Sequence, residues 1–349
     1  MSHILVLATS HKTRGGITSV VKAHQQGTQW KKYNCKWIET HIDTGMFMAL
    51  WYLFKSYLQF LYHLPFAKII HIHLSEPASA MRKLLYFFPA NLFGKKTIVH
   101  FHAFSPDTTI NGSKQWVYRY IFSRAKKVIV LSNSWKEAVN KVFNLDNIEV
   151  VYNPCTTIIS DKQYPKQKHI LYAGAINAHK GYADMIRAFA KIAAVHKDWK
   201  IVFAGNGEIE QGKQLAKGLG IEKQCQFLGW VNGEEKDKAF KEASIFCLPS
   251  YAEGFPMAVL DAWAYGLPVI TTPVGGIPDV AQNEENMLIF TPGDIEKLAE
   301  CTHMLITDKK CYKRIAEASD NFAKKEFSIK EINKQIEDVY ESLLASKLK

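Results

Sequence analysis

The chain has 349 residues, of which 47% are hydrophobic, and its formal net charge at pH 7 is +11. This length favours two domains, and this apolar content excludes a disordered chain. The six cysteines are scattered without a Cys-x-x-Cys pair, which argues against a disulfide framework or a zinc site and favours a reduced, cytoplasmic protein.

The positive charge belongs to the first half of the sequence. Residues 1–160 hold 19 Lys and Arg against 7 Asp and Glu, a net of +12, whereas residues 161–349 hold 25 against 26, a net of −1. Such an excess suits nucleic acid or an anionic membrane surface. Because no recognisable nucleic-acid-binding module is found, we expect no nucleic-acid partner and keep a basic nucleic-acid-binding protein as the weaker alternative.

A buried strand is predicted over residues 4–8, and a glycine-containing loop and a helix follow it. The loop includes Arg14, Gly15 and Gly16. Strand, glycine-rich loop and helix together form the usual cradle for a phosphate. The spacing matches neither a dinucleotide fingerprint nor a P-loop, so an ordinary turn is the competing interpretation.

The stretch from residue 46 to residue 64 is rich in aromatic residues and predicts a helix. One interpretation is a helix packed on the sheet. The other is a helix lying in a membrane interface, where aromatic side chains and lysines are favoured. A membrane span is rejected because Lys55, Gln59 and His63 interrupt a stretch that would need about 20 nearly continuous apolar residues.

Two further strands, predicted over residues 68–73 and 97–104, carry alternating histidines. Two histidines at this spacing without a third ligand are weak evidence for a metal, so no metal site is predicted. His73 lies at the ligand end of its strand. His102 lies near the end of the second strand and is a candidate site residue. His100, two positions earlier, points to the same face and is the second choice for that position in the site.

The second half begins after a polar linker that ends near residue 168. A strand over 169–174 leads to a loop containing Lys180, which is a candidate ligand for phosphate. A helix is predicted from about residue 182 to residue 195. A later strand ends in a Gly-x-Gly turn at Gly205 and Gly207, and an amphipathic helix is predicted over 328–344.

The most informative stretch is residues 250–280. A loop with Glu253 leads into an apolar helix over residues 257–265, and Asp261 lies eight residues after Glu253. This helix begins at the carboxyl end of a buried parallel strand, where open α/β sheets bind ligands. Its free N–H groups suit a phosphate or a polarised hydroxyl. The two acids are expected to face the same side.

These residues also carry a resemblance to a known family. Glu253 to Asp261 is similar to the E-x7-E signature of the family-4 retaining glycosyltransferases, with Asp as the second acid, and the flanking sequences Leu-Pro-Ser and Val-Gly-Gly-Ile-Pro match as well. The resemblance implies the GT-B fold, an α/β architecture of two Rossmann-like, doubly wound parallel-sheet domains facing across a cleft. It implies an acceptor-side domain over 1–160, a nucleotide-sugar-binding domain over 161–327, and a helix over 328–349 that crosses back to the first domain.

The resemblance also implies roles for particular residues. Glu253 and His102 are the implied catalytic residues, the first binding hydroxyls of the donor sugar and the second supporting the sugar near its reacting carbon. Asp261 would accept hydrogen bonds from the ribose. The implied donor-binding residues are Gly15, Gly16, Lys180, Gly205, Gly207, Trp230, Val231, Gly254, Phe255, Pro256, Met257, Ala258 and Asp261, and the acceptor-side residues are His73 and Arg14.

One position departs from the family pattern. The motif Gly-Arg-x4-Lys-Gly holds the donor diphosphate, and Lys180 matches it, but Ala175 stands at the position of the arginine. Alanine has no donor that could replace bidentate contacts to a phosphate. Arg14 and His179 are the candidates that would compensate.

The implied activity is retaining, metal-independent transfer of a sugar from a nucleotide-diphosphate sugar, with no other cofactor. The acceptor would be a glycan or a polyprenyl-diphosphate-linked glycan in bacterial surface polysaccharide biosynthesis. The sequence contains no Asp-x-Asp motif, and it leaves the nucleotide base open. The expected location is the cytoplasm, in part on the inner face of the membrane. The alternative is a non-catalytic subunit that binds a nucleotide sugar or a glycan, which Ala175 and Asp261 would favour.

Overall fold

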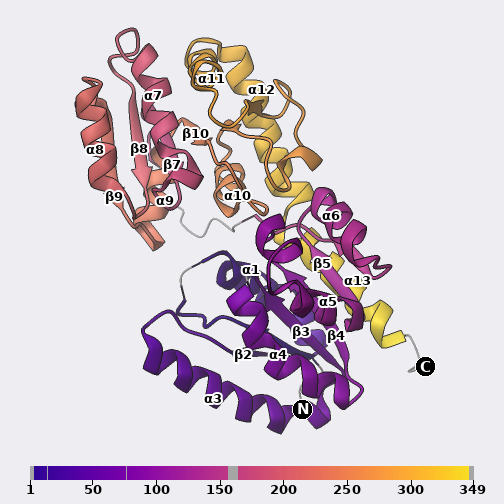
Figure 1. Ribbon diagram of the computed structural model, residues 1–349. Coiled ribbons are helices and arrows are strands. Elements are labelled where there is room, and N and C mark those ends of the chain that lie inside the picture. The colour runs from indigo at the N-terminus through magenta and orange to yellow at the C-terminus, as the bar shows by residue number, and fades with distance from the viewer. Residues whose placement is uncertain (1–3, 14, 76, 156–163, 346–349) are drawn as a thin grey trace. The chain divides into compact units, whose positions relative to one another are not determined.

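The computed structural model describes residues 4–13, 15–75, 77–155 and 164–345. The chain divides into two compact units (Figure 1). Unit 1 consists of Met1–Pro154 and Ile329–Lys349, and unit 2 consists of Cys155–Ser328. Each unit contains a six-stranded parallel sheet covered by helices. The α/β prediction of two Rossmann-like, doubly wound domains is therefore confirmed.

The sheet of unit 1 has the strand order β2-β1-β3-β4-β5-β6, and all its strand pairs are parallel. Strand β1 is a continuous apolar run, whereas β3 and β4 are equally buried but carry histidines, and helices cover both faces of these strands. The strands are β1 (Ile4–Ala8), β2 (Cys35–Glu39), β3 (Ile69–Leu74), β4 (Lys96–Phe101), β5 (Lys127–Val130) and β6 (Ile148–Val150).

One face of this sheet packs on helices from both ends of the chain. Alternate residues of β1, among them Ile4 and Val6, share a buried cluster with Val21 of α1 (Gly16–Gln25) and with Ile336 and Val339 of α13 (Ile329–Ala345). The α2 helix (Thr28–Lys32) lies against α13. The final helix is thus part of unit 1, because its apolar stripe completes this core.

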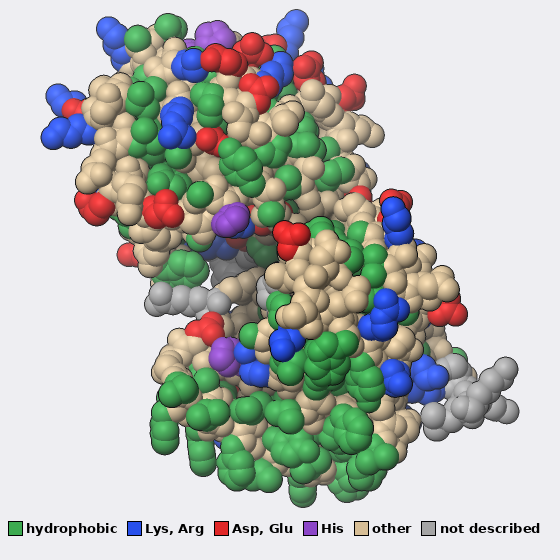
Figure 2. Space-filling view, viewed as in Figure 1, with side chains coloured by type: hydrophobic (Ala, Val, Ile, Leu, Met, Phe, Trp, Pro, Cys, Tyr) green, Lys and Arg blue, Asp and Glu red, His purple; other side chains and the backbone are tan. Residues whose placement is uncertain are grey.

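The other face of the sheet is covered by α3 (Met46–His63), α4 (Pro77–Leu92) and α5 (Gln115–Arg124), and α6 (Asn133–Phe143) packs on β5 and β6. In α3, Ser56 and Phe60 are buried, and Tyr86 of α4 contacts both of them. Many other apolar side chains of α3 and α4 are exposed, and Figure 2 shows them gathered on the surface of unit 1. The α3 helix therefore packs on the sheet with one narrow side and leaves a wide apolar side uncovered.

The sheet of unit 2 has the strand order β12-β11-β10-β7-β8-β9, again with every pair parallel. A parallel strand needs a crossover connection, and a helix supplies it after most of the strands. The strands are β7 (His169–Ala173), β8 (Lys200–Ala204), β9 (Cys225–Gly229), β10 (Ile245–Leu248), β11 (Val269–Thr271) and β12 (Leu288–Ile289).

The helices of unit 2 form two groups. The α7 helix (Tyr182–Ile192) packs against α8 (Ile209–Gly218) and α11 (Ile295–Thr307), while α10 (Met257–Ala264) packs against α12 (Lys309–Asn321). The α9 helix (Gly233–Glu242) meets the end of α10, where the Tyr265 hydroxyl donates to Asp237 at 2.6 Å. The rings of Phe255, Trp263 and Phe327 contact one another, and this aromatic cluster packs against α10 through Trp263.

Candidate functional site

The loops at the carboxyl edge of the unit 2 sheet are joined to one another through their backbones. The Ile176 amide donates to the Asn206 carbonyl at 2.8 Å, and the Glu208 amide donates back to the Ile176 carbonyl at 2.7 Å. The Tyr251 amide donates to the His179 carbonyl at 2.8 Å. Loops that follow three different strands thus form one surface where parallel sheets bind their ligands.

An ion pair lies at the centre of this surface. The Lys180 ammonium donates to Glu253 Oε1 at 2.5 Å, and the Ser250 hydroxyl donates to the same oxygen at 2.7 Å. The Glu253 side chain is 8% exposed, whereas that of Lys180 is 28% exposed. The carboxylate is thus largely buried and held by the Ser250 hydroxyl, and the ammonium stays accessible to solvent. Two residues predicted separately from the sequence are in direct contact here.

A short helix, η3 (Ala178–Lys180), fixes the position of Lys180. Asn177 caps it by accepting a hydrogen bond from the Lys180 amide at 3.0 Å. The loop then turns into α7 at Gly181. The ammonium is therefore carried on a tight turn rather than on a long loop, which limits the positions that it can reach.

The α10 helix begins beside Glu253 with its first turn uncapped by any described side chain. Pro256 is the N-cap residue, so the next amides belong to Met257 and Ala258. Gly275 has φ +62°, and a Cβ there would lie 1.9 Å from the Gly254 carbonyl oxygen. Only glycine fits this approach, which holds the predicted donor loop against the loop that follows β11.

The structure gives Asp261 a partner that sequence reasoning missed. The Lys236 ammonium of α9 lies 2.6 Å from Asp261 Oδ2, and the Asp261 side chain is 10% exposed. Glu253 lies in the loop before α10, so the eight-residue spacing does not place the two acids on one helical face, as the sequence had suggested. Lys236 sits in a polar helix, where a single lysine gives no signal in the sequence.

The remaining predicted donor residues of unit 2 lie in the loops after β8 and β9. A Cβ at Gly205 would lie 1.7 Å from the Gly174 carbonyl oxygen, and Gly207 pairs with Ile176 in an isolated bridge. Trp230, which is 42% exposed, and Val231 follow β9. These positions line the same edge of the sheet, and their contacts with a donor stay a prediction.

Ala175 lies in the loop between β7 and η3, and it is exposed. The Tyr172 hydroxyl donates to its carbonyl at 2.7 Å, so the backbone at this position is fixed. A longer side chain here would extend into solvent at the same edge of the sheet. The structure therefore leaves room for the arginine that the family pattern expects.

In unit 1, the glycine loop after β1 ends at the start of α1. Gly15 is the N-cap residue and Gly16 the first helical residue, and both are exposed. No described side chain caps the N-terminus of this helix. Arg14, predicted on the acceptor side, lies outside the described residues.

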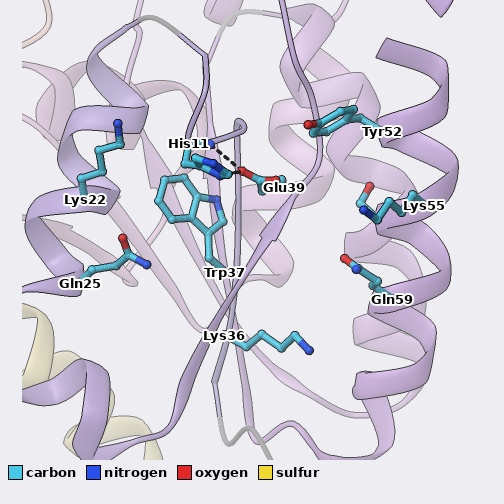
Figure 3. Close-up of a pocket in the computed structure, with 10 residues that line it drawn as sticks. His11, Lys22, Gln25, Lys36, Trp37, Glu39, Tyr52, Lys55 and Gln59 are labelled. Atoms are coloured by element: carbon cyan, nitrogen blue, oxygen red, sulfur yellow. Dashed lines mark hydrogen bonds and ion pairs between the residues drawn. The ribbon is translucent and has the colours of Figure 1, made fainter. Parts of the chain in front are cut away.

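A cavity of about 450 Å³ opens in unit 1 between α1, the edge strand β2 and α3 (Figure 3). Lys22, Lys36 and Lys55 come from these three elements in turn and line it. Among the described residues that line it, the single acid is Glu39, which accepts hydrogen bonds from the Ser10 hydroxyl at 2.9 Å and from the His11 amide at 2.7 Å. The His11 ring also contacts that carboxylate. The cavity therefore has a net positive charge that the sequence did not reveal.

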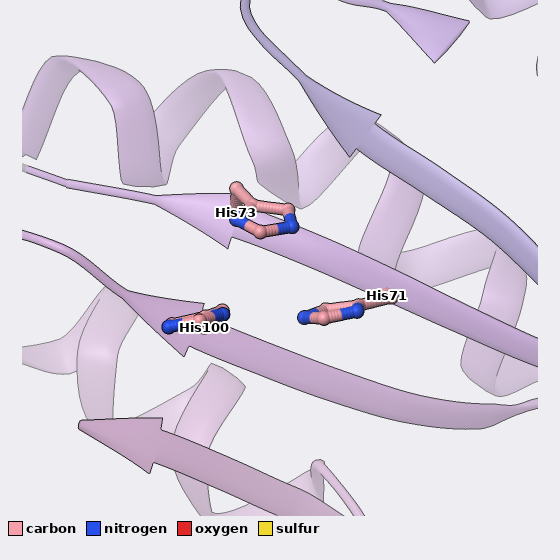
Figure 4. Close-up of side chains that lie close together, drawn as sticks. All are labelled: His71, His73 and His100. Atoms are coloured by element: carbon pink, nitrogen blue, oxygen red, sulfur yellow. The ribbon is translucent and has the colours of Figure 1, made fainter. Parts of the chain in front are cut away.

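A cluster of histidines lies on the face of the unit 1 sheet that α1 and α13 cover. His71 and His73 of β3 and His100 of β4 have ring nitrogens within 4.8 Å of one another, and all three are buried (Figure 4). His71 pairs with the Tyr340 hydroxyl at 2.7 Å. The cross-strand register of β3 and β4 supplies the third histidine, which sequence reasoning had treated only as a second choice for the site.

Burial keeps these rings neutral. It lowers the pKa of His102 to about 3 and that of His24, which covers the cluster from α1, to about 4. His102 is half-buried at the end of β4, and its Nε2 lies 2.8 Å from His73 Nδ1. His73 itself is 1% exposed, so it lies behind His102 and orients that ring. Among the described residues, the ring nitrogens of His71, His73 and His100 have the spacing of metal ligands.

Comparison with known proteins shows that each half of the chain matches a sequence model of glycosyltransferases. Residues 157–322 match the sequence model described as "Glycosyl transferases group 1", and residues 5–157 match that of "Glycosyltransferase Family 4". A match over 98% of the chain is found to the crystal structure of Anabaena HepE in complex with UDP, with a TM-score of 0.79 and 17% identity over that protein's full length. At this identity the likeness shows the fold, which is GT-B.

Curated relatives agree with this assignment. An uncharacterised glycosyltransferase of Haemophilus influenzae is 29% identical over 55% of each chain. A lipopolysaccharide 1,6-galactosyltransferase of Salmonella typhimurium is 28% identical over 59% of each chain. An N-acetyl-alpha-D-glucosaminyl L-malate synthase of Bacillus anthracis is 25% identical over 79% of this chain and 75% of its own. The match to the first of these relatives spans about half of its length.

Proposed function

Because the chain belongs to the group 1 glycosyltransferases with the GT-B fold, we propose that it transfers a sugar from a nucleotide-diphosphate sugar to a glycan or a lipid-linked glycan, with retention at the anomeric carbon. The contact between Lys180 and Glu253 carries the proposal. In a sugar nucleotide, the sugar hydroxyls and the diphosphate are adjacent. A carboxylate that accepts from hydroxyls beside an ammonium that faces phosphate matches this arrangement.

The first step is donor binding by unit 2. The Lys180 ammonium and the open amides of α10 would face the diphosphate, where helix termini and cations favour negative charge. Glu253 would accept from the sugar hydroxyls, and Asp261 from the ribose. HepE, which shares the fold, was crystallised with UDP and with UDP-glucose, and this supports a nucleotide sugar as the donor.

The second step is transfer without a metal. Charge that develops on the departing diphosphate would be neutralised by Lys180 and helix amides, a kind of contact that typically contributes ~3–4 kcal/mol each to a transition state. His102 stays neutral above about pH 4 because its pKa is about 3, so it can share a hydrogen bond but does not supply a charge. We assign the base that accepts the acceptor's proton to the departing phosphate.

The acceptor class is supported by one relative and by the surface of unit 1. The name of the Salmonella typhimurium relative specifies lipopolysaccharide, an amphiphilic glycan. The exposed apolar side of α3 and α4 suits a protein that works at a membrane surface, in keeping with surface polysaccharide biosynthesis. The relative from Bacillus anthracis has malate in its name, and a small hydroxy acid is therefore the second acceptor class to test.

The test is release of nucleoside diphosphate from a panel of nucleotide sugars, with EDTA present throughout. We expect turnover with one donor, full activity in EDTA, and loss of turnover in Glu253→Ala. Glu137→Ala, an exposed acid on α6, is the matched control and should retain activity. Nucleotide binding without turnover for every donor and acceptor would support the non-catalytic subunit instead. Activity that EDTA abolishes and Mg²⁺ restores would overturn the metal-independent reaction.

A further inference from the structure

Unit 1 exposes an apolar face made by α3 and α4. Its largest side chains include Phe47, Trp51, Phe54 and Leu58 of α3, and Leu85 and Phe88 of α4. Phe47 is 82% exposed, and Phe54 and Phe88 are 57% and 58% exposed. Figure 2 shows this crowded hydrophobic surface on unit 1. A contiguous exposed patch of this kind marks a binding surface rather than chance exposure.

The positions of these residues follow the helix period. Residues 47, 51, 54 and 58 are spaced by four, three and four, which places them in one stripe along α3. Residues 85 and 88 form the matching stripe on α4, and the two helices pack together through Tyr57 and Tyr86. Among the described helices, none is long and apolar enough to cross a bilayer. An apolar stripe on such a helix suits lying in the interface.

The cationic cavity lies on the neighbouring side of the same helix. Tyr52, Lys55 and Gln59 of α3 line it, and each follows one residue after a member of the apolar stripe. One residue is about 100° around a helix, so α3 has hydrocarbon-binding side chains on one side and cavity-lining polar groups on the next. A ligand that reaches both sides must have a hydrophobic part and an anionic part.

The charge of the cavity selects phosphate. Three lysines and one carboxylate line the cavity, and Ser10 and His11 already satisfy that carboxylate. The Lys36 ammonium lies 2.6 Å from His63 Nε2, at the end of α3. Ammonium groups are common phosphate ligands in proteins. The remaining lining groups include the Tyr52 hydroxyl and the Gln25 and Gln59 amides, which are hydrogen-bond donors for phosphate oxygens (Figure 3).

We propose that the cavity between α1, β2 and α3 binds the phosphate of a membrane lipid while the apolar face of α3 and α4 enters the hydrocarbon of the same leaflet. This deepens the proposed function and rests on it, since it makes a phosphate-bearing lipid the membrane ligand of unit 1 and the carrier class of its acceptor. The same lipid would then contact the apolar face and the cationic cavity, and the excess positive charge of residues 1–160 would attract it. The lipid, rather than a soluble phosphate, is the occupant.

The experiment measures partition of the full chain onto vesicles of phosphatidylcholine, with or without phosphatidic acid. The native protein should bind the anionic vesicles more tightly. Lys22→Ala with Lys55→Ala should weaken that binding about 30-fold, since each lysine near an anionic surface contributes about fivefold. Lys136→Ala with Lys141→Ala removes the same charge from exposed positions of α6, and it should change binding less than about threefold because screening limits distant charges.

A second variant tests the apolar face. Phe47→Ser with Phe54→Ser changes only exposed side chains, so the fold should persist, and it should reduce partition onto both kinds of vesicle. Equal losses from the two lysine pairs would mean diffuse electrostatic attraction and would overturn the cavity as the site. Inorganic phosphate or glycerol phosphate that binds as tightly as the vesicles would overturn the lipid as the occupant. A native protein that binds neither kind of vesicle would overturn the whole inference.

Binding of nucleoside diphosphate separates this inference from the proposed function. It depends on unit 2 and should be unchanged in all three double variants. A native protein that turns over a nucleotide sugar but binds neither kind of vesicle would overturn the lipid site alone. Vesicle binding without any nucleotide binding would leave the lipid surface in place and overturn the transferase.

Discussion

Replacement of Lys180 by methionine tests the centre of the proposed donor site. Methionine keeps most of the side-chain length and removes the ammonium. In the structure that ammonium neutralises Glu253, whose carboxylate then keeps only the Ser250 hydroxyl among the side-chain partners described. The change therefore affects both stability and catalysis, and the two effects have different sizes.

The effect on stability is expected to be small. Breaking a fully buried ion pair costs about 3–5 kcal/mol because the remaining charge is left in a dry site. Lys180 is 28% exposed, so water can solvate Glu253 in the variant, and a cost of about 1–2 kcal/mol is expected. The effect on catalysis is larger, because loss of one contact to the developing charge costs ~3–4 kcal/mol, or ~100–1000-fold in kcat/KM.

The assay is steady-state release of nucleoside diphosphate, with urea unfolding measured on the same samples. Lys191→Met is the matched control, since Lys191 pairs with Glu296 at 2.6 Å on an exposed part of unit 2. An exposed pair contributes about 0–1 kcal/mol, and this control should keep its full rate. A Lys180→Met protein with a native rate, or one in which the rate falls only in proportion to the folded fraction, would refute the reasoning.

Three further predictions concern the donor loops and the histidine cluster. Ala175→Arg should tighten nucleoside diphosphate binding about tenfold, measured by calorimetry, since a charge-assisted hydrogen bond contributes about 1.5–3 kcal/mol. The control is Ala178→Arg at an exposed position of η3, which should leave the affinity unchanged. Gly205→Ala should destabilise unit 2 by about 1–3 kcal/mol because its Cβ meets backbone, whereas Gly218→Ala, where a Cβ meets nothing, should leave the urea midpoint unchanged or raise it. The pKa of His24 falls to about 4 on folding. Below about pH 6.5 the unfolded chain therefore binds more protons than the folded chain. The stability present at pH 7 is lost as the pH falls toward 4. Each buried histidine of the cluster should remove about 1 kcal/mol between pH 7 and pH 5.5. Hydrogen-exchange protection of β3 and β4 that is equal at both pH values, after correction for the pH dependence of the intrinsic exchange rate, would contradict this.

Much of the fold was predictable because local patterns are strong in this chain. Continuous apolar runs indicated the buried strands, and the predicted helix over 257–265 is α10, which ends one residue earlier. The helix predicted over 46–64 is α3, and the sequence left two interpretations of its outer side open. The structure shows that two side chains of α3 are buried and many others are exposed. The helix therefore packs on unit 1, and its contact with a membrane stays a prediction.

The candidate site was predictable only in part. Lys180 and Glu253 were each predicted from a motif, but their direct contact depends on how the loops after β7 and β10 meet. Lys236 carries no motif, and only the packing of α9 on α10 brings it to Asp261. The predicted roles of His102, Gly15 and Gly16 stay predictions, and Arg14 lies outside the described residues.

The sequence by itself determined the class of the fold, several of its strands and helices, and the resemblance to a glycosyltransferase family, because these follow from short-range periodicity and from motifs that are contiguous in the chain. The tertiary structure decided which charges meet. The Lys180–Glu253 pair, the Lys236–Asp261 pair, the three lysines of the cavity and the His71, His73 and His100 cluster all join residues from different elements. Their proximity is set by strand order, register and helix packing, which no single stretch of sequence contains.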